Sequence, residues 1–248
     1  MLKKERQSFI VQQLNIHNKV LSSDLSCQLK VSEDTIRRDL QELSEEGRLL
    51  KVHGGALSSS YHFTLHNNTV YALREKQVIA KKAVELIKNG MLVLLTGGTT
   101  IRELVKALPI DLDATFITVS IPIALELLNH PVSEVIFLGN KLSKSAQIAT
   151  GAEVVTKLAD IKADICFLGT NCIDCHQGIT DTDWDIIEVK KAMIKAANKV
   201  ISLSISEKLD TVQKLKVCEI NQIDILVTEL DPAATTFDNY LVSGIHII

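Results

Sequence analysis

Apolar residues recur at helical spacing in three stretches at the start of the chain, and each stretch predicts a helix. The first helix is predicted over residues 3–14. The second runs to Leu29 from Ser22 as its N-cap, with Cys27 packed beside its apolar face. The third spans residues 33–46, is capped by Ser32 and ends at Gly47. The inward side chains are those of Phe9, Ile10, Leu14, Leu25, Leu29, Ile36, Leu40 and Leu43.

A strand-like run over residues 48–52 follows the third helix and leads into Gly54-Gly55, which predicts a turn. Three helices followed by a hairpin are typical of a winged helix-turn-helix. Residues 58–72 are polar and lack sustained periodicity, as expected of a linker. We therefore divide the chain into a winged helix-turn-helix domain over residues 1–57, a linker over 58–73 and a second domain over 74–248.

The second domain alternates helical and strand-like segments, which predicts an α/β fold: a doubly wound, mostly parallel sheet with helices on both faces. Its apolar residues are mainly Ile, Leu, Val and Ala, as buried parallel strands require. Helices are predicted over residues 75–87, 99–108, 122–129, 152–158 and 185–197. Strands are predicted over residues 91–95, 115–119, 135–138, 165–168, 199–203, 217–219 and 225–227.

Composition and charge narrow the class of protein. The net charge is −3, but residues 1–57 carry nine basic and eight acidic side chains, an asymmetry whose sign suits an N-terminal DNA-binding module. The start, MLKKERQSF, lacks the apolar core of a signal peptide, and no stretch approaches the roughly 20 apolar residues of a membrane span. Five scattered cysteines fit reduced thiols. These features predict a cytoplasmic protein without membrane contact.

The third helix carries the DNA-reading chemistry. With Ile36, Leu40 and Leu43 inward, its other faces present Thr35, Arg37, Arg38 and Gln41, behind the Ser32 cap. The early turns of a recognition helix meet base edges in the major groove, where arginine contacts guanine or phosphate. On the wing, Arg48, Lys51 and His53 are expected to contact phosphate or the minor groove. The predicted partner is a double-stranded DNA operator, bound by a homodimer or higher homo-oligomer because half-sites are related by two-fold symmetry.

The segment VSEDTIRRDLQELSEEGRLLKVHGGA resembles the N-terminal signature of the DeoR family of bacterial repressors. The family has a similar Thr-[Ile/Val]-Arg-Arg-Asp-Leu recognition helix and a wing ending in His-Gly-Gly. The resemblance implies major-groove contacts by Thr35, Arg37 and Arg38, with residues 53–55 closing the wing. It also implies a repressor of carbohydrate metabolism genes that a small metabolite releases.

The segment LVLLTGGTTI at residues 92–101 reads as a strand, a glycine turn and a helix start. Glycines let the backbone approach an anion, and the free N–H groups of a helix start point at the same spot. A phosphate is therefore the expected occupant. The segment is neither a Walker loop nor a dinucleotide fingerprint, and we predict no cofactor, no metal and no catalytic residue.

The resemblance continues over residues 74–228 and implies a sensor fold like that of sugar-phosphate isomerases, without catalysis. It implies a phosphorylated sugar as effector. Three positions depart from the family pattern: Thr96 stands in place of Asp, Val119 in place of Asn and Ile205 in place of Asp. The implied pocket has Gly98, Thr99 and Thr100 at the phosphate, Ser120, Asn171, Asp174 and Lys190 around the sugar, and Lys208 reaching the anion.

Two alternatives remain open. Cys172 and Cys175 have the spacing of a redox or metal-binding pair and could make the chain a thiol- or metal-responsive regulator. The second alternative is a sugar-phosphate isomerase with an accessory DNA-binding domain, for which Asp174, Asp181, Asp183 and Glu188 offer carboxylates. The isomerase-type glycine-rich segment reads Cys-His-Gln-Gly at residues 175–178, so its lysine is missing.

Overall fold

The computed structural model describes residues 1–17, 19–58, 70–144 and 146–248, and it divides the chain into two compact units, Met1–Tyr71 and Ala72–Ile248. Most of the predicted linker lies outside the described residues. Its first residue, Ser58, ends a strand, and its last, Leu73, begins a helix. Among the helices that are described, none combines the length and apolar character needed to cross a bilayer.

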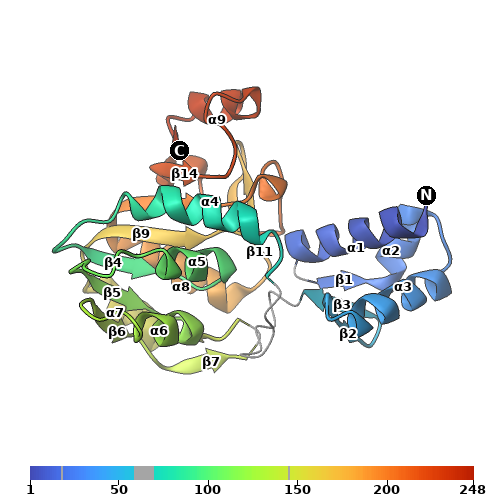
Figure 1. Ribbon diagram of the computed structural model, residues 1–248, viewed down its shortest axis with the longest axis horizontal. Helices are drawn as coiled ribbons and strands as arrows, with labels where there is room; N and C mark the ends of the chain where they lie inside the picture. The colour runs from blue at the N-terminus through green and yellow to red at the C-terminus, as the bar shows by residue number, and fades with distance from the viewer. Residues whose placement is uncertain (18, 59–69, 145) are drawn as a thin grey trace. The chain divides into compact units, whose positions relative to one another are not determined.

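The N-terminal unit contains three helices and a small antiparallel sheet (Figure 1). Strand β3 lies between β1 and β2 in this sheet, so the wing hairpin β2–β3 is extended by β1. This is the predicted winged helix-turn-helix. The elements are α1 (Lys3–His17), β1 (Lys19–Leu21), α2 (Ser22–Leu29), α3 (Glu33–Glu45), β2 (Leu49–Val52) and β3 (Gly55–Ser58).

Helix α3 begins and ends where its sequence requires. The Ser32 side chain accepts a hydrogen bond from the Thr35 N–H, which satisfies one of the free donors of the first turn. Gly47 has φ +72°, and the N–H of Arg48 donates to the carbonyl of Leu43, so the helix closes in a Schellman motif. Ile36, Leu40 and Leu43 are completely buried, against Ile10, Leu14 and Leu25. The three predicted stripes therefore form one core.

Four details of the N-terminal unit differ from the sequence predictions. Leu21 is the N-cap of α2, and Ser22 is its first helical residue. Cys27 is exposed, because the buried stripe of this short helix passes through Ser22 and Leu25. The wing turn is at residues 53–54, and Gly55 lies in β3, where a Cβ atom would be 2.0 Å from the Val20 carbonyl oxygen. Strand β1, which requires this close approach, was not predicted.

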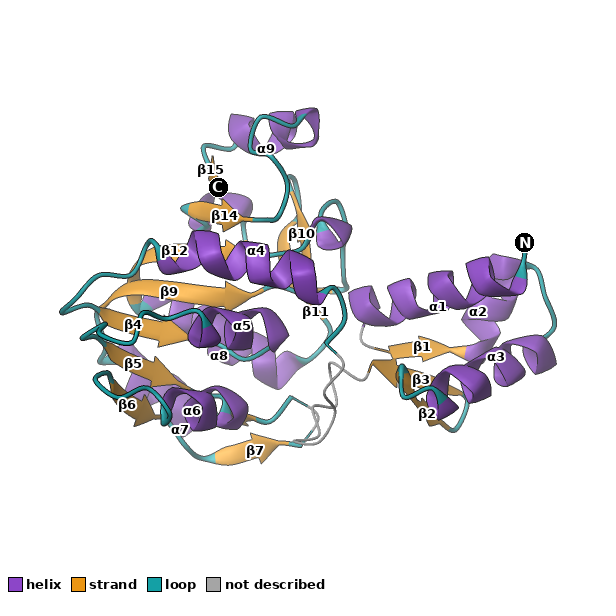
Figure 2. Ribbon diagram, in the orientation of Figure 1, coloured by secondary structure: helices purple, strands orange, loops and turns teal. Residues whose placement is uncertain are grey.

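The second unit is built on a seven-stranded sheet in the order β15-β14-β12-β9-β4-β5-β6, in which every pairing is parallel (Figure 2). This confirms the predicted doubly wound α/β class. The strands of this sheet are β4 (Leu92–Leu95), β5 (Thr115–Thr118), β6 (Glu134–Phe137), β9 (Ala163–Gly169), β12 (Ala197–Leu203), β14 (Ile225–Val227) and β15 (His246–Ile247).

Helices cover both faces of the sheet (Figure 1). Helices α4 (Leu73–Val84), α5 (Thr99–Lys106) and α6 (Ile121–Leu127) pack side by side on one face, and α7 (Ala152–Ala159) and α8 (Trp184–Lys195) pack together on the other. The chain runs from β4 through β5 to β6 and then returns to place β9 on the other side of β4. Strand order therefore reverses beside β4, and such a switch point is where open α/β sheets bind ligands.

Two smaller sheets complete the second unit. Strands β7 (Lys141–Ser143) and β8 (Ile148–Thr150) form a hairpin, and β10 (Cys172–Asp174), β11 (Gly178–Asp181) and β13 (Leu215–Cys218) form an antiparallel sheet. The predicted strand at residues 217–219 thus belongs outside the main sheet. Four of these five strands, with β15 and α9 (Asp238–Val242), were not predicted, because segments of two to five residues show little periodicity.

Candidate DNA-binding surface and effector site

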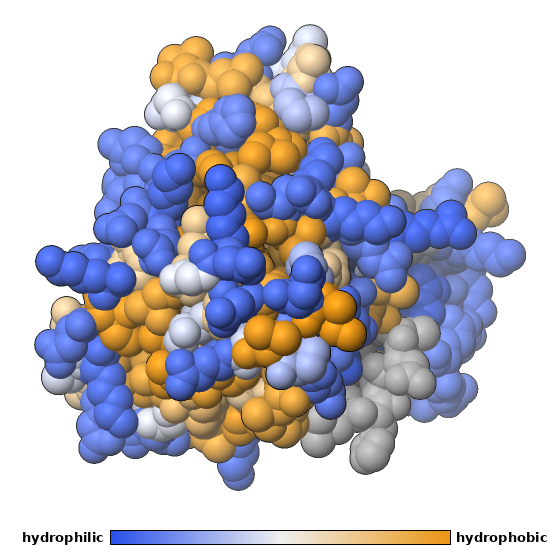
Figure 3. All heavy atoms as spheres, turned by 60° about the vertical axis from the view of Figure 1, so that its left-hand side comes forward, coloured by the Kyte–Doolittle hydropathy of each residue, from blue (hydrophilic) through white to orange (hydrophobic). Residues whose placement is uncertain are grey.

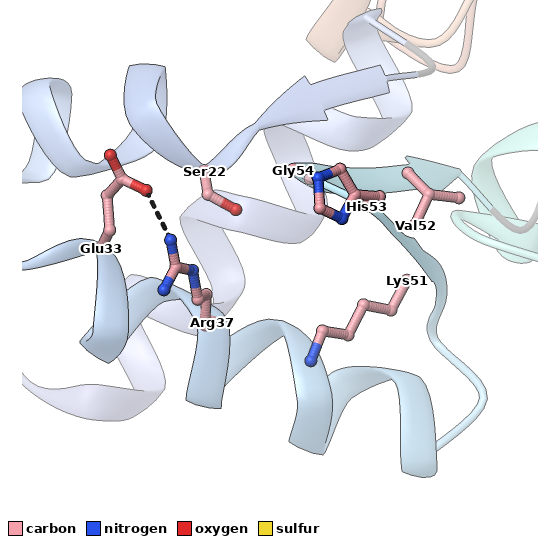
Figure 4. Close-up of a pocket in the computed structure, with 8 residues that line it drawn as sticks. Ser22, Glu33, Arg37, Lys51, Val52, His53 and Gly54 are labelled. Atoms are coloured by element: carbon pink, nitrogen blue, oxygen red, sulfur yellow. Dashed lines mark hydrogen bonds and ion pairs between the residues drawn. The ribbon is translucent and has the colours of Figure 1, made fainter.

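A groove of about 390 Å³ separates the recognition helix α3 from the wing (Figure 4). Three of the predicted DNA-binding side chains line it: Arg37 from α3, and Lys51 and His53 from the wing. The first turn of α2 closes the groove, because the Ser22 N–H donates to the Gly54 carbonyl. Glu33 lines the groove as well, so two cations and a histidine face one carboxylate there. Such a groove beside the start of a recognition helix suits a DNA phosphate or a base edge.

Most of the predicted contact residues are engaged with neighbours in the free protein. Arg37 forms ion pairs with Glu33 and Asp34, each at 3.2 Å (Figure 4 shows the first). Lys51 Nζ donates to Gln41 Oε1 (2.8 Å), and Arg48 lies 3.6 Å from Glu46. These pairs are solvent-exposed and therefore weak, so DNA can replace them at little cost.

Arg38 and Thr35 differ in how available they are. The Arg38 side chain is exposed and forms no ion pair within the described part of the chain. Thr35 is half-buried, and its hydroxyl lies 2.9 Å from the Ser32 hydroxyl, so both residues shape the helix start. Arg38 is thus the side chain on α3 most ready to contact DNA.

Sequence reasoning missed the side chain that holds α3 in place. Asp39 is buried and accepts hydrogen bonds from the Arg6 guanidinium on α1, one of them at 3.1 Å from Nη2 to Oδ1. A carboxylate on the inward face of an amphipathic helix breaks the apolar pattern. This break in the apolar pattern, directly after Arg37-Arg38, is the feature from which a buried partner for Asp39 could have been predicted.

The predicted phosphate loop of the candidate effector site lies at the carboxyl end of β4. Gly98 is the N-cap of α5 and has φ +115°, a conformation that side chains rarely adopt. Because Gly98 has no side chain to cap the helix, the first backbone N–H groups of α5 can donate hydrogen bonds to an anion. Gly98 is exposed and Thr99 half-buried, whereas Thr100 is buried. The backbone of this turn and Thr99 are therefore the accessible part of the predicted phosphate loop.

Three lysines from separate elements gather at this end of the sheet: Lys76 on α4, Lys190 on α8 and Lys208 after β12. Burial, with the positive charge of Lys208, lowers the pKa of Lys76 to about 7. Burial also lowers the pKa of Lys208 to about 8, opposed in part by a nearby carboxylate, Asp181. The Lys208 ammonium donates to the Thr170 carbonyl (2.8 Å). An anion bound beside these lysines would favour their charged forms.

Asp181 is the carboxylate that pairs with Lys190. It is buried, 2.7 Å from Lys190 Nζ, and it accepts a hydrogen bond from Asn171 (3.0 Å). The family resemblance places Asp174, and not Asp181, among the predicted sugar-binding residues. Asp174 accepts hydrogen bonds from the N–H groups of His176 and Gln177, both at 2.8 Å, so it shapes the β10–β11 turn.

The positions that depart from the family pattern support the fold. The Thr96 hydroxyl accepts a hydrogen bond from the Gly169 N–H (2.8 Å) and donates to the Phe167 carbonyl (3.2 Å), tying the ends of β4 and β9 together. Val119 and Ile205 are buried. Ser120 is buried at the N-cap of α6, and its hydroxyl would lie 3.3 Å from a Cβ atom added to Gly97. These residues shape the strand ends around the turn.

The two cysteines singled out in the sequence lie in different surroundings. Cys172 is near Lys208 and Asp181, whereas Cys175 is near Asp174 and Asp210. Both are buried, and burial raises the pKa of each thiol. Because the thiolate is the reactive form, this environment does not favour a thiol sensor.

A winged helix-turn-helix followed by a regulatory α/β domain defines a DNA-binding transcriptional regulator. Residues 6–61 match the DeoR-like helix-turn-helix domain, and residues 72–230 match the DeoR C terminal sensor domain. The chain belongs to the DeoR family of transcriptional regulators.

Characterised relatives align over nearly the whole chain. The HTH-type transcriptional regulator GolR of Listeria innocua is 33% identical over 91% of this chain and 90% of its own. The HTH-type transcriptional repressor GlcR of Bacillus subtilis is 32% identical over 100% of this chain and 96% of its own. These relatives are regulators and not enzymes. A solved ribose 5-phosphate isomerase A from Methanocaldococcus jannaschii covers 54% of this chain and 53% of its own at 19% identity, with a TM-score of 0.41, too distant to bear on function.

Proposed function

We propose that this DeoR-family regulator is a repressor of carbohydrate metabolism genes that binds its operator as a dimer or higher oligomer and is released by a phosphorylated sugar. The lysine cluster carries the effector assignment. Lys76 is buried on α4, Lys208 is half-buried and close enough to affect the pKa of Lys76, and Asp181 already pairs with Lys190. A phosphate dianion would favour the charged forms of Lys76 and Lys208, and the Asn171–Asp181 pair would meet sugar hydroxyl groups.

The DNA-binding assignment is carried by α3 and the wing. We expect Arg38→Ala to weaken operator binding about 10- to 100-fold, because one arginine contact with a base or phosphate contributes about 1–3 kcal/mol. The duplex is first selected from a random-sequence pool with the native protein. Fluorescence anisotropy then measures Kd at several salt concentrations for the variant and for the control Lys4→Ala, an exposed cation on α1. Equal affinities for native protein and Arg38→Ala would remove Arg38 from the DNA surface.

The effector assignment is tested by thermal unfolding with phosphorylated sugars and their unphosphorylated parents. A ligand at about 100 times its Kd stabilises the folded protein by about 2.7 kcal/mol. We expect one phosphorylated sugar to raise the Tm, its parent sugar to have no effect, and Lys208→Gln to abolish the shift. The control is Lys88→Gln, an exposed lysine that precedes β4, at the amino-terminal ends of the strands and away from the lysine cluster. A panel of phosphorylated sugars without any shift would contradict the assignment.

A further inference from the structure

Strand β6 is an open edge of the seven-stranded sheet. It pairs with β5 on one side and is last in the strand order. Its backbone N–H groups alternate in direction. The N–H of Glu134 donates to the carbonyl of Ala114, just before β5 (3.0 Å), and the N–H of Leu138 donates to the carbonyl of Thr118 in β5 (2.9 Å). The intervening Val135 and Phe137 therefore turn their backbone N–H and C=O groups toward the open edge.

The edge is also unusually apolar. Parallel sheets normally bury their strands on both faces, yet β6 exposes Ile136 and Phe137 on opposite faces. Helix α6 and the turn that leads to β6 add three more exposed apolar side chains. Orange surface is visible low on the forward face in Figure 3, the side on which Figure 1 places α6 and β6. The exposed fractions are Leu125 46%, Leu128 69%, Val132 50%, Ile136 39% and Phe137 41%.

Proteins usually protect such an edge with charges, proline or a very short strand. The opposite edge of this sheet follows that rule, since β15 has two residues. Strand β6 has four residues and one charge, Glu134 at its start, and the run Val135-Ile136-Phe137 that follows carries no charge and no proline. Summed over both faces of the sheet, the five side chains along this edge expose on the order of 400 Å² of apolar surface. Together with the strand backbone, this is a large share of the roughly 800 Å² that each partner buries in a stable interface.

We propose that β6 pairs antiparallel with β6 of a second copy of this chain, which joins two sensor sheets across a two-fold axis. A second copy is the occupant that the edge itself selects, because outward N–H and C=O groups need another strand edge and the same apolar residues then face each other. The pairing does not depend on DNA or on an effector, so it can be tested separately from the proposed function.

The outward backbone groups fix the register. Val135 of each copy pairs with Phe137 of the other, which forms four hydrogen bonds around the axis. Ile136 then faces Ile136 of the other copy in a non-hydrogen-bonded pair, with the two Cα atoms about 4.5 Å apart. The two Glu134 residues lie on opposite sides of the axis, roughly 13 Å apart, where their repulsion is screened.

This register predicts a symmetric cross-link. Cross-strand Cα atoms about 4.5 Å apart are within the range that a disulfide spans. In a Cys27→Ser background, which removes the exposed native thiol, Ile136→Cys treated with diamide should run as a covalent dimer on non-reducing gels. The control Ile110→Cys, an exposed apolar position in the turn before β5, should remain monomeric on the gel. Failure of Ile136→Cys to cross-link above the control would overturn this register.

Sedimentation velocity tests the interface without cross-linking. We expect the native chain and Ile110→Lys to sediment as dimers or larger species at micromolar concentration. Ile136→Lys should shift to a species of half that size, with an unchanged circular dichroism spectrum. A native chain that is monomeric at all concentrations, or an Ile136→Lys variant that assembles like the native chain, would overturn the proposal. An Ile136→Lys variant that assembles like the native chain would overturn this interface alone, whereas a monomeric native chain would also count against operator binding by a preformed oligomer.

Discussion

Replacing Asp39 with alanine is expected to lower the free energy of unfolding of the N-terminal unit by about 3 kcal/mol. Asp39 is buried on α3 and accepts hydrogen bonds from Arg6 on α1. Removing the carboxylate leaves a mostly buried guanidinium without its partner, which costs far more than losing an exposed ion pair. Helix α3 would then lose its fixed position against α1, and operator binding should weaken although no DNA contact is removed.

Hydrogen exchange monitored by mass spectrometry can assign this effect to one unit. Amides in peptides from residues 3–58 should exchange about 100-fold faster in Asp39→Ala, and those from residues 72–248 should be unchanged. The matched control is Asp34→Ala, which removes an exposed carboxylate from the same helix and should change exchange little. Similar exchange rates in the Asp39 and Asp34 variants would show that the Arg6–Asp39 pair does not hold α3 in place.

Effector affinity is expected to fall steeply as the pH rises above 7. Lys76 and Lys208 have pKa values of about 7 and about 8, well below the ordinary value of 10.5. A bound phosphate favours their charged forms, so above these pKa values binding must take up protons. Each lysine then weakens binding up to about tenfold per pH unit, and the Kd should rise on the order of 100-fold between pH 7 and pH 9.

The single tryptophan provides the readout. Trp184 is exposed at the start of α8, the helix that carries Lys190, so its fluorescence can follow titration with the phosphorylated sugar found by thermal unfolding. Phosphate is already a dianion throughout this pH range, since its second pKa is about 6. The Lys208→Gln variant should bind weakly and show a shallower pH profile. A Kd that stays constant from pH 7 to pH 9 would show that these two lysines do not contact the effector.

The sequence predicted the elements whose periodicity is long or whose ends are marked. Helix α3 combines an apolar stripe, a Ser32 cap and a terminal glycine, and its three inward residues are completely buried. The parallel strands were recognised as apolar runs between helices. Strands β1, β7, β8, β10 and β11 have three or four residues each, and their pairing depends on contacts distant in sequence, such as Gly55 against Val20.

The candidate effector site was predicted in outline but not in its charge balance. The glycine turn was predicted from the order of residues along the chain, and Lys208 was predicted from the family resemblance. The pairing of Lys190 with Asp181, and the approach of Lys76 from a helix more than 100 residues away, depend on how strands and helices are ordered in space. Asp174 was predicted from a family motif, and in the structure its carboxylate accepts the hydrogen bonds of the β10–β11 turn.

The most direct test of the regulatory mechanism is release of DNA by the effector. A labelled duplex selected with the native protein is bound at low concentration, and phosphorylated sugars and their parents are titrated while anisotropy is recorded. We expect one phosphorylated sugar to release the duplex from the native protein, its parent sugar to have no effect, and the Lys208→Gln complex to remain bound at the same concentrations. Release by the parent sugar, or equal release from native protein and Lys208→Gln, would contradict phosphate sensing by the lysine cluster.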